Sequence, residues 1–146
     1  MTIRRAVAGD LDILAPLFDS YRRFYRLTGD LDAARLFLRD RMERNESVIF
    51  VAFEDGKAVG FTQLYPSFSS GAMARIFVLN DLFVAFEARR SGLGSGLLRA
   101  AAEFGRAEGA VRLVLSTELT NTVAQSVYEK NGWKRDTVFC VYQLAL

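Results

Sequence analysis

The sequence predicts a single α/β domain, residues 1–146, with a mixed β-sheet flanked by helices. The length fits one domain with one core. Apolar runs typical of strands alternate with the three-and-four-residue spacings typical of helices, in the order β-α-α-β-β-β-α-β-α-β. No repeat, low-complexity segment or linker interrupts this order.

The N-terminal part is expected to form a strand and two helices. The strand runs from Ile3 to Val7, and the first helix follows with Asp10 as its N-cap. Pro16 lies within that helix and is expected to bend it or shift its start, because its ring clashes with a carbonyl one turn back. The second helix begins around Leu31 and ends near Asn45.

Three strands are expected next. Asp55-Gly56 is a hairpin signal between the apolar runs 48–53 and 58–65, so these two strands are antiparallel. The polar segment from Pro66 through Gly71 is expected to be a loop. A third strand, from Ile76 to Ala85, leads into a glycine-rich segment.

The remaining chain is expected to alternate helices and strands. A helix from Gly92 to Glu108 stops at Gly109, and a buried strand occupies 111–116. A short helix starts at Thr120 or Asn121 and ends at Gly132. The run 138–144 is expected to form the last strand, with Cys140 buried in it.

Composition excludes several kinds of site. The chain has no histidine, which removes Ser-His and Cys-His nucleophiles and His-based metal sites, so no metal is expected. A single cysteine cannot form an intramolecular disulfide. The net charge of +2 is spread among acids and bases and gives nucleic-acid binding little support. No apolar stretch reaches the roughly 18 residues of a membrane span, so a cytoplasmic protein without membrane contact is expected.

The segment from Arg89 through Gly96 is the most informative motif, since it joins a predicted strand to a predicted helix. Glycines there let backbone N–H groups surround an anion, and the helix N-terminus adds attraction. The segment therefore predicts a site for a phosphorylated ligand. It lacks the Gly-Lys-Ser/Thr of a Walker A loop, and Leu97 replaces the third glycine of the dinucleotide fingerprint. A glycine-rich turn without a ligand is the alternative.

The pattern Arg-x-x-Gly-x-Gly at Arg89, Gly92 and Gly94 resembles the acetyl-CoA pyrophosphate loop of the GCN5-related N-acetyltransferase (GNAT) family. Residues 121–133 resemble that family's segment Asn-x-x-Ala-x-x-x-Tyr-x-x-x-Gly-Trp/Phe. Its Asn121 and Tyr128 align along one helix face. The element order is similar over essentially the whole chain. Alternatively, Tyr128 is a core residue and Asn121 only caps its helix.

The resemblance implies a GNAT-type sheet and an acetyl-CoA-dependent N-acetyltransferase that works by direct transfer in a ternary complex. Arg89, Arg90 and the backbone of 91–96 would hold the pyrophosphate, with the adenosine 3′-phosphate as an alternative partner for Arg90. Backbone groups of a splayed strand would bind pantetheine and polarise the thioester. Tyr128 would protonate the CoA thiolate. The implied cofactor-binding residues are Leu82, Phe83, Val84, Arg89, Arg90, Ser91, Gly92, Leu93, Gly94, Ser95, Gly96, Asn121, Ala124 and Tyr128.

Asp81 is the second expected catalytic residue, beside Tyr128. A carboxylate in an apolar strand is costly unless it is paired or faces a wet cleft. We expect the cleft, where Asp81 would hold a substrate ammonium and accept its proton through water; a structural hydrogen bond is the alternative. Polyamine acetyltransferases, which this stretch resembles, often have Glu-Asp where this chain has Asn80-Asp81, so the identity of the base stays open.

The substrate is expected to be a small cationic primary amine. Tyr21, Tyr25, Asp30 and Asp81, with the segment 66–70, correspond to the walls of the family's acceptor cleft, and aromatic rings and acids suit a cation. Polyamine or diamine enzymes and the yeast-type histone and polyamine acetyltransferases are nearest. An aminoglycoside or protein amine is an alternative.

Two non-enzymatic alternatives remain: a non-catalytic acyl-CoA-binding regulatory module, and a phosphate-binding domain for another nucleotide. A homodimer is expected, because small members of the family often dimerise. The apolar run Val138 to Leu146 is the candidate interface, unless it is only the last core strand.

Overall fold

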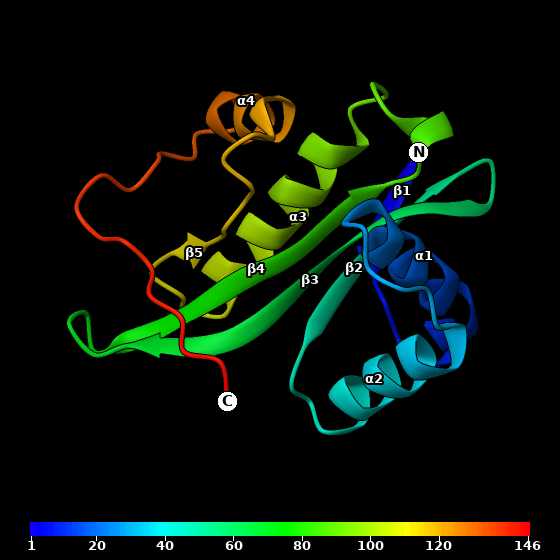
Figure 1. Cartoon of the computed structure of the whole chain (residues 1–146), viewed down its shortest axis with the longest axis horizontal. Coiled ribbons are helices and arrows are strands. Elements are labelled where there is room, and N and C mark those ends of the chain that lie inside the picture. The colour runs from blue at the N-terminus through cyan, green and yellow to red at the C-terminus, as the bar shows by residue number, and fades with distance from the viewer. The chain divides into compact units, whose positions relative to one another are not determined.

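The computed structural model describes all 146 residues, which form two compact units, residues 1–116 and 117–146. The first unit contains a five-stranded sheet and three helices, and the second contains one helix (Figure 1). The strands are β1 (Thr2–Arg5), β2 (Val48–Glu54), β3 (Lys57–Ser69), β4 (Ala74–Val84) and β5 (Leu113–Val114). The helices are α1 (Leu11–Phe24), α2 (Leu31–Glu43), α3 (Leu93–Ala107) and α4 (Thr122–Lys130), with short 3-10 turns η1 (Ala8–Asp10) and η2 (Phe86–Ala88).

The sheet has the strand order β1-β2-β3-β4-β5. The first four strands pair antiparallel with their neighbours, and β5 pairs parallel with β4. The predicted α/β class with a mixed sheet is therefore confirmed. None of the helices has the length and apolarity that crossing a bilayer requires.

Two apolar clusters lie on opposite faces of the sheet. Odd-numbered residues of β2, such as Ile49 and Val51, pack with α1 and α2, whereas Ala52 packs with α3. This division follows from the two-residue period of a strand. On α1, Leu14 is buried where the helical spacing predicts it, and the helix runs through Pro16 from Leu11 without a break. The expected shift of the helix start at Pro16 is therefore wrong.

The β2–β3 hairpin has the predicted Asp55-Gly56 turn, and both residues have the positive φ of a type I′ turn, 51° and 77°. The predicted loop over 66–71 is wrong for most of its length. Strand β3 continues to Ser69, and Pro66 pairs with Phe77 in a long β3–β4 hairpin (Figure 1). Pairing with β4 overrides the loop composition of this segment.

One extra residue in β4, Asn80, shifts the register between β3 and β4. Gln63 pairs with Asp81, but the next residue of β3, Leu64, pairs with Leu79, which leaves Asn80 without a cross-strand partner. This is a β-bulge, and one extra residue exchanges the faces on which the following side chains lie.

The ring contacts of β4 show the exchange. Before the bulge, Phe77 packs against Phe104 of α3, with ring centroids 5.2 Å apart. After it, Phe83 packs against Tyr21 of α1, with centroids 6.3 Å apart. Asp81 lies on the same side of the bulge as Phe83. The bulge therefore turns its carboxylate toward α1.

The last predicted strand, 138–144, is not formed. Cys140, expected to be buried, is exposed. The large apolar residues of this segment are also exposed; they are Val138, Phe139, Val141, Tyr142, Leu144 and Leu146. The composition of 138–144 is typical of a strand, but the segment does not form one.

Candidate active site

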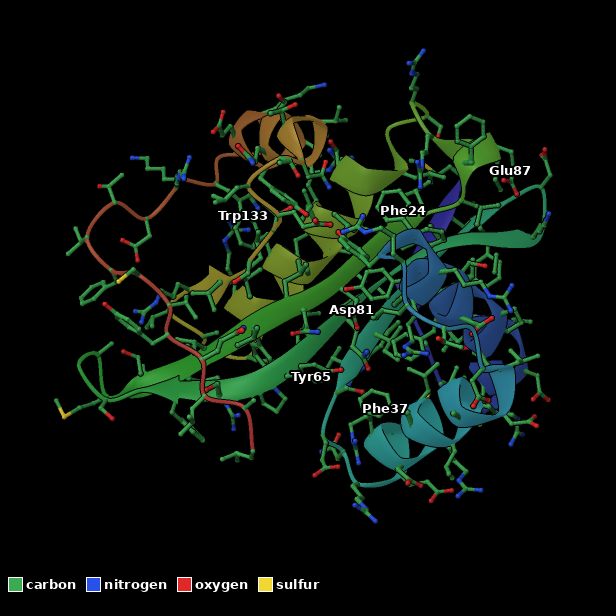
Figure 2. All side chains as sticks on the ribbon, viewed as in Figure 1. Phe24, Phe37, Tyr65, Asp81, Glu87 and Trp133 are labelled. Atoms are coloured by element: carbon green, nitrogen blue, oxygen red, sulfur yellow. The ribbon has the colours of Figure 1, made fainter.

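Polar side chains surround Asp81, which lies on β4 (Figure 2). The residue is only 3% exposed, and each carboxylate oxygen accepts from an amide. Gln63 Nε2 donates to Oδ2 at 2.6 Å, and Asn80 Nδ2 donates to Oδ1 at 3.1 Å. The Tyr21 hydroxyl donates to the Asn80 carbonyl at 3.4 Å. The structural hydrogen bonds that the sequence left as an alternative for Asp81 are therefore present, and its side chain is buried.

Burial raises the pKa of Asp81, and the hydrogen bonds from Gln63, Asn80 and Tyr21 partly offset that rise. No lysine or arginine forms an ion pair with this carboxylate. Burial, together with the charge of Asp81, also raises the pKa values of Tyr21 and Tyr65. Both phenols are therefore neutral around a carboxylate that has no counter-charge.

The outer edge of β4 is open beyond the bulge. Strand β5 pairs with β4 only at Phe77 and Val78, so no strand pairs with that edge between the bulge and Val84. Unpaired backbone N–H and C=O groups are available to an extended ligand at such an edge. The splaying of this strand that the family resemblance implies stays a prediction.

Arg89 reaches back toward this edge. Its Nε donates to the Val84 carbonyl at 3.0 Å, and its guanidinium lies 4.9 Å from the ring centroid of Phe24, which Figure 2 shows at the end of α1. Two further rings, those of Phe83 and Phe86, are within 5.9 Å. Arg89 thus contacts aromatic rings and the end of β4 in this structure.

The start of α3 suits an anion. Gly92 is its N-cap, with a φ of 82°, and no side chain caps the helix. The first N–H groups of a helix lack intrahelical partners and attract anions. A Cβ on Gly94 would meet nothing within 4 Å, so the backbone there is open to a ligand. These residues fit the pyrophosphate of a CoA-like ligand.

Three of the predicted pyrophosphate residues, Ser91, Leu93 and Gly96, have further roles in the fold. Gly96 donates its N–H to the Gly92 carbonyl within the helix, and a Cβ on it would lie 2.6 Å from Cδ1 of Ile3. Gly96 is thus a helix-packing residue, and its prediction as a backbone phosphate ligand is wrong. Leu93 is buried in the core, and the Ser91 hydroxyl donates to the Ala88 carbonyl at 2.5 Å.

In the second unit, the predicted helix is formed as α4. The Asn121 side chain accepts from the backbone N–H of Ala124 at 3.1 Å and caps the helix. Tyr128 packs near Trp133, with ring centroids 6.2 Å apart. Gly132, with a φ of 88°, follows the end of the helix as expected. Asn121 therefore has the capping role that the sequence left as an alternative.

The structure brings only some of the expected substrate residues together. Tyr21 belongs to the Asp81 cluster. The ring of Tyr25 packs edge-on against the ring of Tyr21, with ring centroids 5.1 Å apart. Asp30 instead caps α2 by accepting from Ala33 N at 3.0 Å, and its side chain is exposed. The segment 66–70 belongs largely to the long hairpin.

Gln63 and Tyr65 were missed by the sequence analysis. They lie at alternate positions of β3, on the side of Asp81. The only available signal was the Thr62-Gln63 pair in an otherwise apolar strand, because a polar residue in a buried strand needs a partner. No group of three or more His, Cys, Asp or Glu side chains is arranged to hold a metal ion.

Comparison with known proteins identifies the family. The acetyltransferase (GNAT) family matches residues 14–133. The chain is 51% identical to the Bacillus subtilis (strain 168) protein named uncharacterized N-acetyltransferase YhfO, over 99% of this chain and 97% of that protein. The crystal structure of a probable acetyltransferase, 44% identical, superposes with a TM-score of 0.95 over 100% of this chain and 98% of that one.

The fold extends to more distant structures. Aminoglycoside N-acetyltransferase AAC(6')-Iy, in complex with CoA, has a TM-score of 0.83 at 20% identity, over 99% of this chain and 95% of that one. The family resemblance seen in the sequence motifs is confirmed by the family match and by the close relatives. The chain therefore belongs to the acetyltransferase (GNAT) family and is an N-acetyltransferase.

Proposed function

We propose that this N-acetyltransferase transfers acetyl from acetyl-CoA, the acetyl donor of its family, to a primary amine of a small cationic substrate. The observation that carries the substrate class is Asp81, a buried carboxylate without a positive partner. An uncompensated buried charge is costly, and a bound ammonium would neutralise it. The aromatic side chains of Tyr21 and Tyr65 add surfaces that favour a cation.

The uncapped start of α3 supports the cofactor assignment. In the proposed complex, backbone N–H groups from Ser91 through Ser95 and the guanidinium of Arg90 hold the pyrophosphate. To join them, Arg89 would leave the Val84 carbonyl. The open edge of β4 at 82–84 pairs with the pantetheine amides, and Asn121 and Ala124 are assigned to the same cofactor by family motif. Acetyl-CoA supplies an activated acetyl group as a thioester.

Three groups of the chain then carry the transfer. Asp81 accepts a proton from the bound ammonium, which frees the nitrogen lone pair for attack. Backbone N–H groups near Phe83 and Val84 stabilise the acetyl oxygen as the C–N bond forms and charge develops on it. Tyr128 donates a proton to the sulfur as the C–S bond breaks, and the nitrogen loses its second proton to solvent. Asp81 then gives its proton to solvent and Tyr128 takes one back, which restores both groups. The products are an N-acetylated amine, free CoA and one proton.

Calorimetric titration tests the cofactor, with ATP and NAD as controls. Selective binding of acetyl-CoA is expected, because the loop lacks the residues of the ATP and NAD motifs. Release of CoA thiol is then followed with 1,4-diaminobutane, an aminoglycoside and a peptide with a free N-terminus. Turnover with none of these amines, or equal binding of all three nucleotides, contradicts the proposal.

Tyr128→Phe tests the general acid. The variant is expected to lower kcat by about 10²–10⁴-fold, because it removes the proton donated to the sulfur. The dissociation constant for acetyl-CoA is expected to stay unchanged, and calorimetry measures it. Tyr142→Phe, an exposed tyrosine outside the motif, is the matched control. A Tyr128→Phe variant with full kcat would remove Tyr128 from the mechanism.

We also propose that the protein is a cytoplasmic homodimer that uses residues 1–146 as one catalytic domain. Six large apolar residues of the run 138–146 are exposed, and burying such a side chain stabilises by roughly 1.5–3 kcal/mol. A second copy covering this run would supply that burial. The single cysteine fits a reducing compartment.

A further inference from the structure

Gln63 has an unused acceptor in the middle of the sheet. Its side chain is fully buried, and its Nε2 donates to Asp81 Oδ2 at 2.6 Å. A carboxylate only accepts, so the amide must present its NH2 group there. The amide orientation is thereby fixed, and Oε1 is left buried without a hydrogen-bond partner.

An acceptor left in this state is costly. A buried polar atom without a partner destabilises a protein by about 1–3 kcal/mol, whereas an apolar side chain of the same size would avoid that cost. Gln63 Oε1 is one of only three buried side-chain atoms in the chain that lack a partner. It belongs to the residue that binds Asp81, the buried carboxylate without a counter-charge.

The groups around Asp81 offer a bound ligand more acceptors than donors. Gln63 and Asn80 each use an amide N–H on the carboxylate, and the Tyr21 hydroxyl is directed at the Asn80 carbonyl and at the carboxylate. The remaining acceptor lone pairs and the single negative charge call for a monocation with several N–H groups. Asn80, next to Asp81 in the chain, is exposed, and the 3.4 Å hydrogen bond from Tyr21 to its carbonyl is long.

We propose that Gln63 is a specificity-determining residue whose Oε1 accepts one N–H of the substrate amino group while Asp81 accepts another. This inference rests on the proposed function and deepens its substrate class. A primary ammonium has three N–H groups, so it fills both acceptors and keeps a third N–H. Each methyl added to the nitrogen removes a donor and adds bulk beside two buried side chains. The pair therefore selects a primary amine over its N-methylated forms.

The test uses two cations of this series, methylammonium and tetramethylammonium, on the full chain, with the Gln63 side-chain amide and the Asp81 carboxyl observed by NMR. Methylammonium is expected to shift both sets of resonances saturably, and tetramethylammonium, which has the charge without an N–H, is expected to leave them unchanged. The wild-type protein alone decides this part. Equal responses to the two cations, or no response to either, overturn the inference.

Two variants separate the acceptor role of Gln63 Oε1 from the hydrogen bonds that hold Asp81. Gln63→Leu removes Oε1 and Nε2 and is expected to weaken methylammonium binding, read at Asp81, by about tenfold, the equivalent of one charged hydrogen bond. Asn80→Ala removes the other amide donor to Asp81 but keeps Oε1, and is expected to bind methylammonium more tightly than Gln63→Leu does. Backbone NMR spectra check that both variants fold.

Measurements of turnover test the role of Gln63 separately from the acetyltransferase activity itself. With 1,4-diaminobutane as acceptor, Gln63→Leu is expected to raise KM about tenfold. The ratio of kcat/KM for 1,4-diaminobutane to kcat/KM for N,N′-dimethyl-1,4-diaminobutane is expected to fall. If the wild type acetylates the diamine and Gln63→Leu has the same KM and the same preference between the two diamines, only the role of Gln63 is overturned. A wild-type protein that acetylates no amine contradicts the proposed function, whatever the NMR titration shows.

Discussion

The carboxylate of Asp10 joins the first strand to the first helix. It accepts from Nη1 and Nη2 of Arg4 at 2.8 and 2.9 Å and from the backbone N–H of Val7 at 2.8 Å. The sequence predicted Asp10 as the N-cap of the first helix. The residue does hold that position, but its side chain makes no bond to a helix N–H and binds backward along the chain instead. The hydrogen bond from Arg4 is the main reason that the pKa of Asp10 is lowered from 3.8 to about 2.

This lowered pKa makes part of the stability dependent on pH. A group whose pKa falls on folding stabilises above its unfolded pKa, and that stability is lost as the pH falls through the folded value. Asp10→Asn is expected to reduce the free energy of unfolding at neutral pH by roughly 1–2 kcal/mol, a figure that allows for the half-exposed guanidinium of Arg4. The difference from wild type should shrink between about pH 4 and pH 2, as measured by urea denaturation.

Asp12→Asn is the matched control for this prediction. Asp12 also pairs with an arginine, Arg35, at 2.8 Å, but its side chain is 82% exposed. Exposed ion pairs contribute little, so the control is expected to unfold like the wild type at every pH. Equal stability losses in the Asp10 and Asp12 variants would show that the contacts of Asp10 add nothing specific.

At the scale of elements, two glycines near the start of α3 have opposite surroundings. Gly94 is open, whereas a Cβ on Gly96 would lie 2.6 Å from Cδ1 of Ile3. Gly94→Val is therefore expected to leave the melting temperature nearly unchanged but to weaken acetyl-CoA binding at least about tenfold, by blocking the approach to the backbone. Calorimetry and thermal denaturation measure the two effects.

Gly96→Ala is expected to do the reverse, costing roughly 1–3 kcal/mol of stability through overpacking against β1. Changing Ile3→Val in the same chain removes the Cδ1 methyl that the new Cβ would meet, and is expected to restore much of the loss. Unchanged acetyl-CoA affinity in Gly94→Val, or no rescue in the Ile3→Val double variant, would contradict the placement of these glycines.

The elements that the sequence predicts well are those with a local signal. The helix around Leu14, the Asp55-Gly56 turn and the stop of α3 at Gly109 all follow from spacing or from turn chemistry. The bulge at Asn80 could not be predicted, because the β4 sequence is apolar on both faces and carries no alternation that would reveal a change of register. Burial of Asp81 and its pairing with Gln63 depend on that bulge. The sequence therefore predicted Asp81 and Tyr21 as site residues, but not their burial or their hydrogen-bond partners.

At the scale of the whole molecule, the C-terminal run 138–146 shows that strand pairing cannot be predicted from the composition of one segment. Its composition predicts a strand, but a strand exists only where another one pairs with it. In the proposed homodimer, a second copy supplies the missing burial. Sedimentation at micromolar concentration is expected to show a dimer for the wild type, and Tyr142→Asp with Leu144→Asp is expected to give a monomer.

Phe68→Asp is the control, because Phe68 is also a highly exposed aromatic residue but lies on the β3–β4 hairpin. This variant is expected to stay dimeric. A monomeric wild type at all concentrations, or the loss of the dimer in Phe68→Asp alone, would move the interface away from the C-terminal run.

Trp133, the only tryptophan of the chain, packs near Tyr128 in the unit of residues 117–146. Light that excites indole alone therefore reports on this unit. The rings of the five phenylalanine and tyrosine contacts around Phe61 and Phe83 lie in the other unit and do not absorb that light. Emission that changes when acetyl-CoA binds would show that the helix carrying Tyr128 responds to the cofactor. The protein thus contains its own optical probe, positioned beside the residue assigned as the general acid.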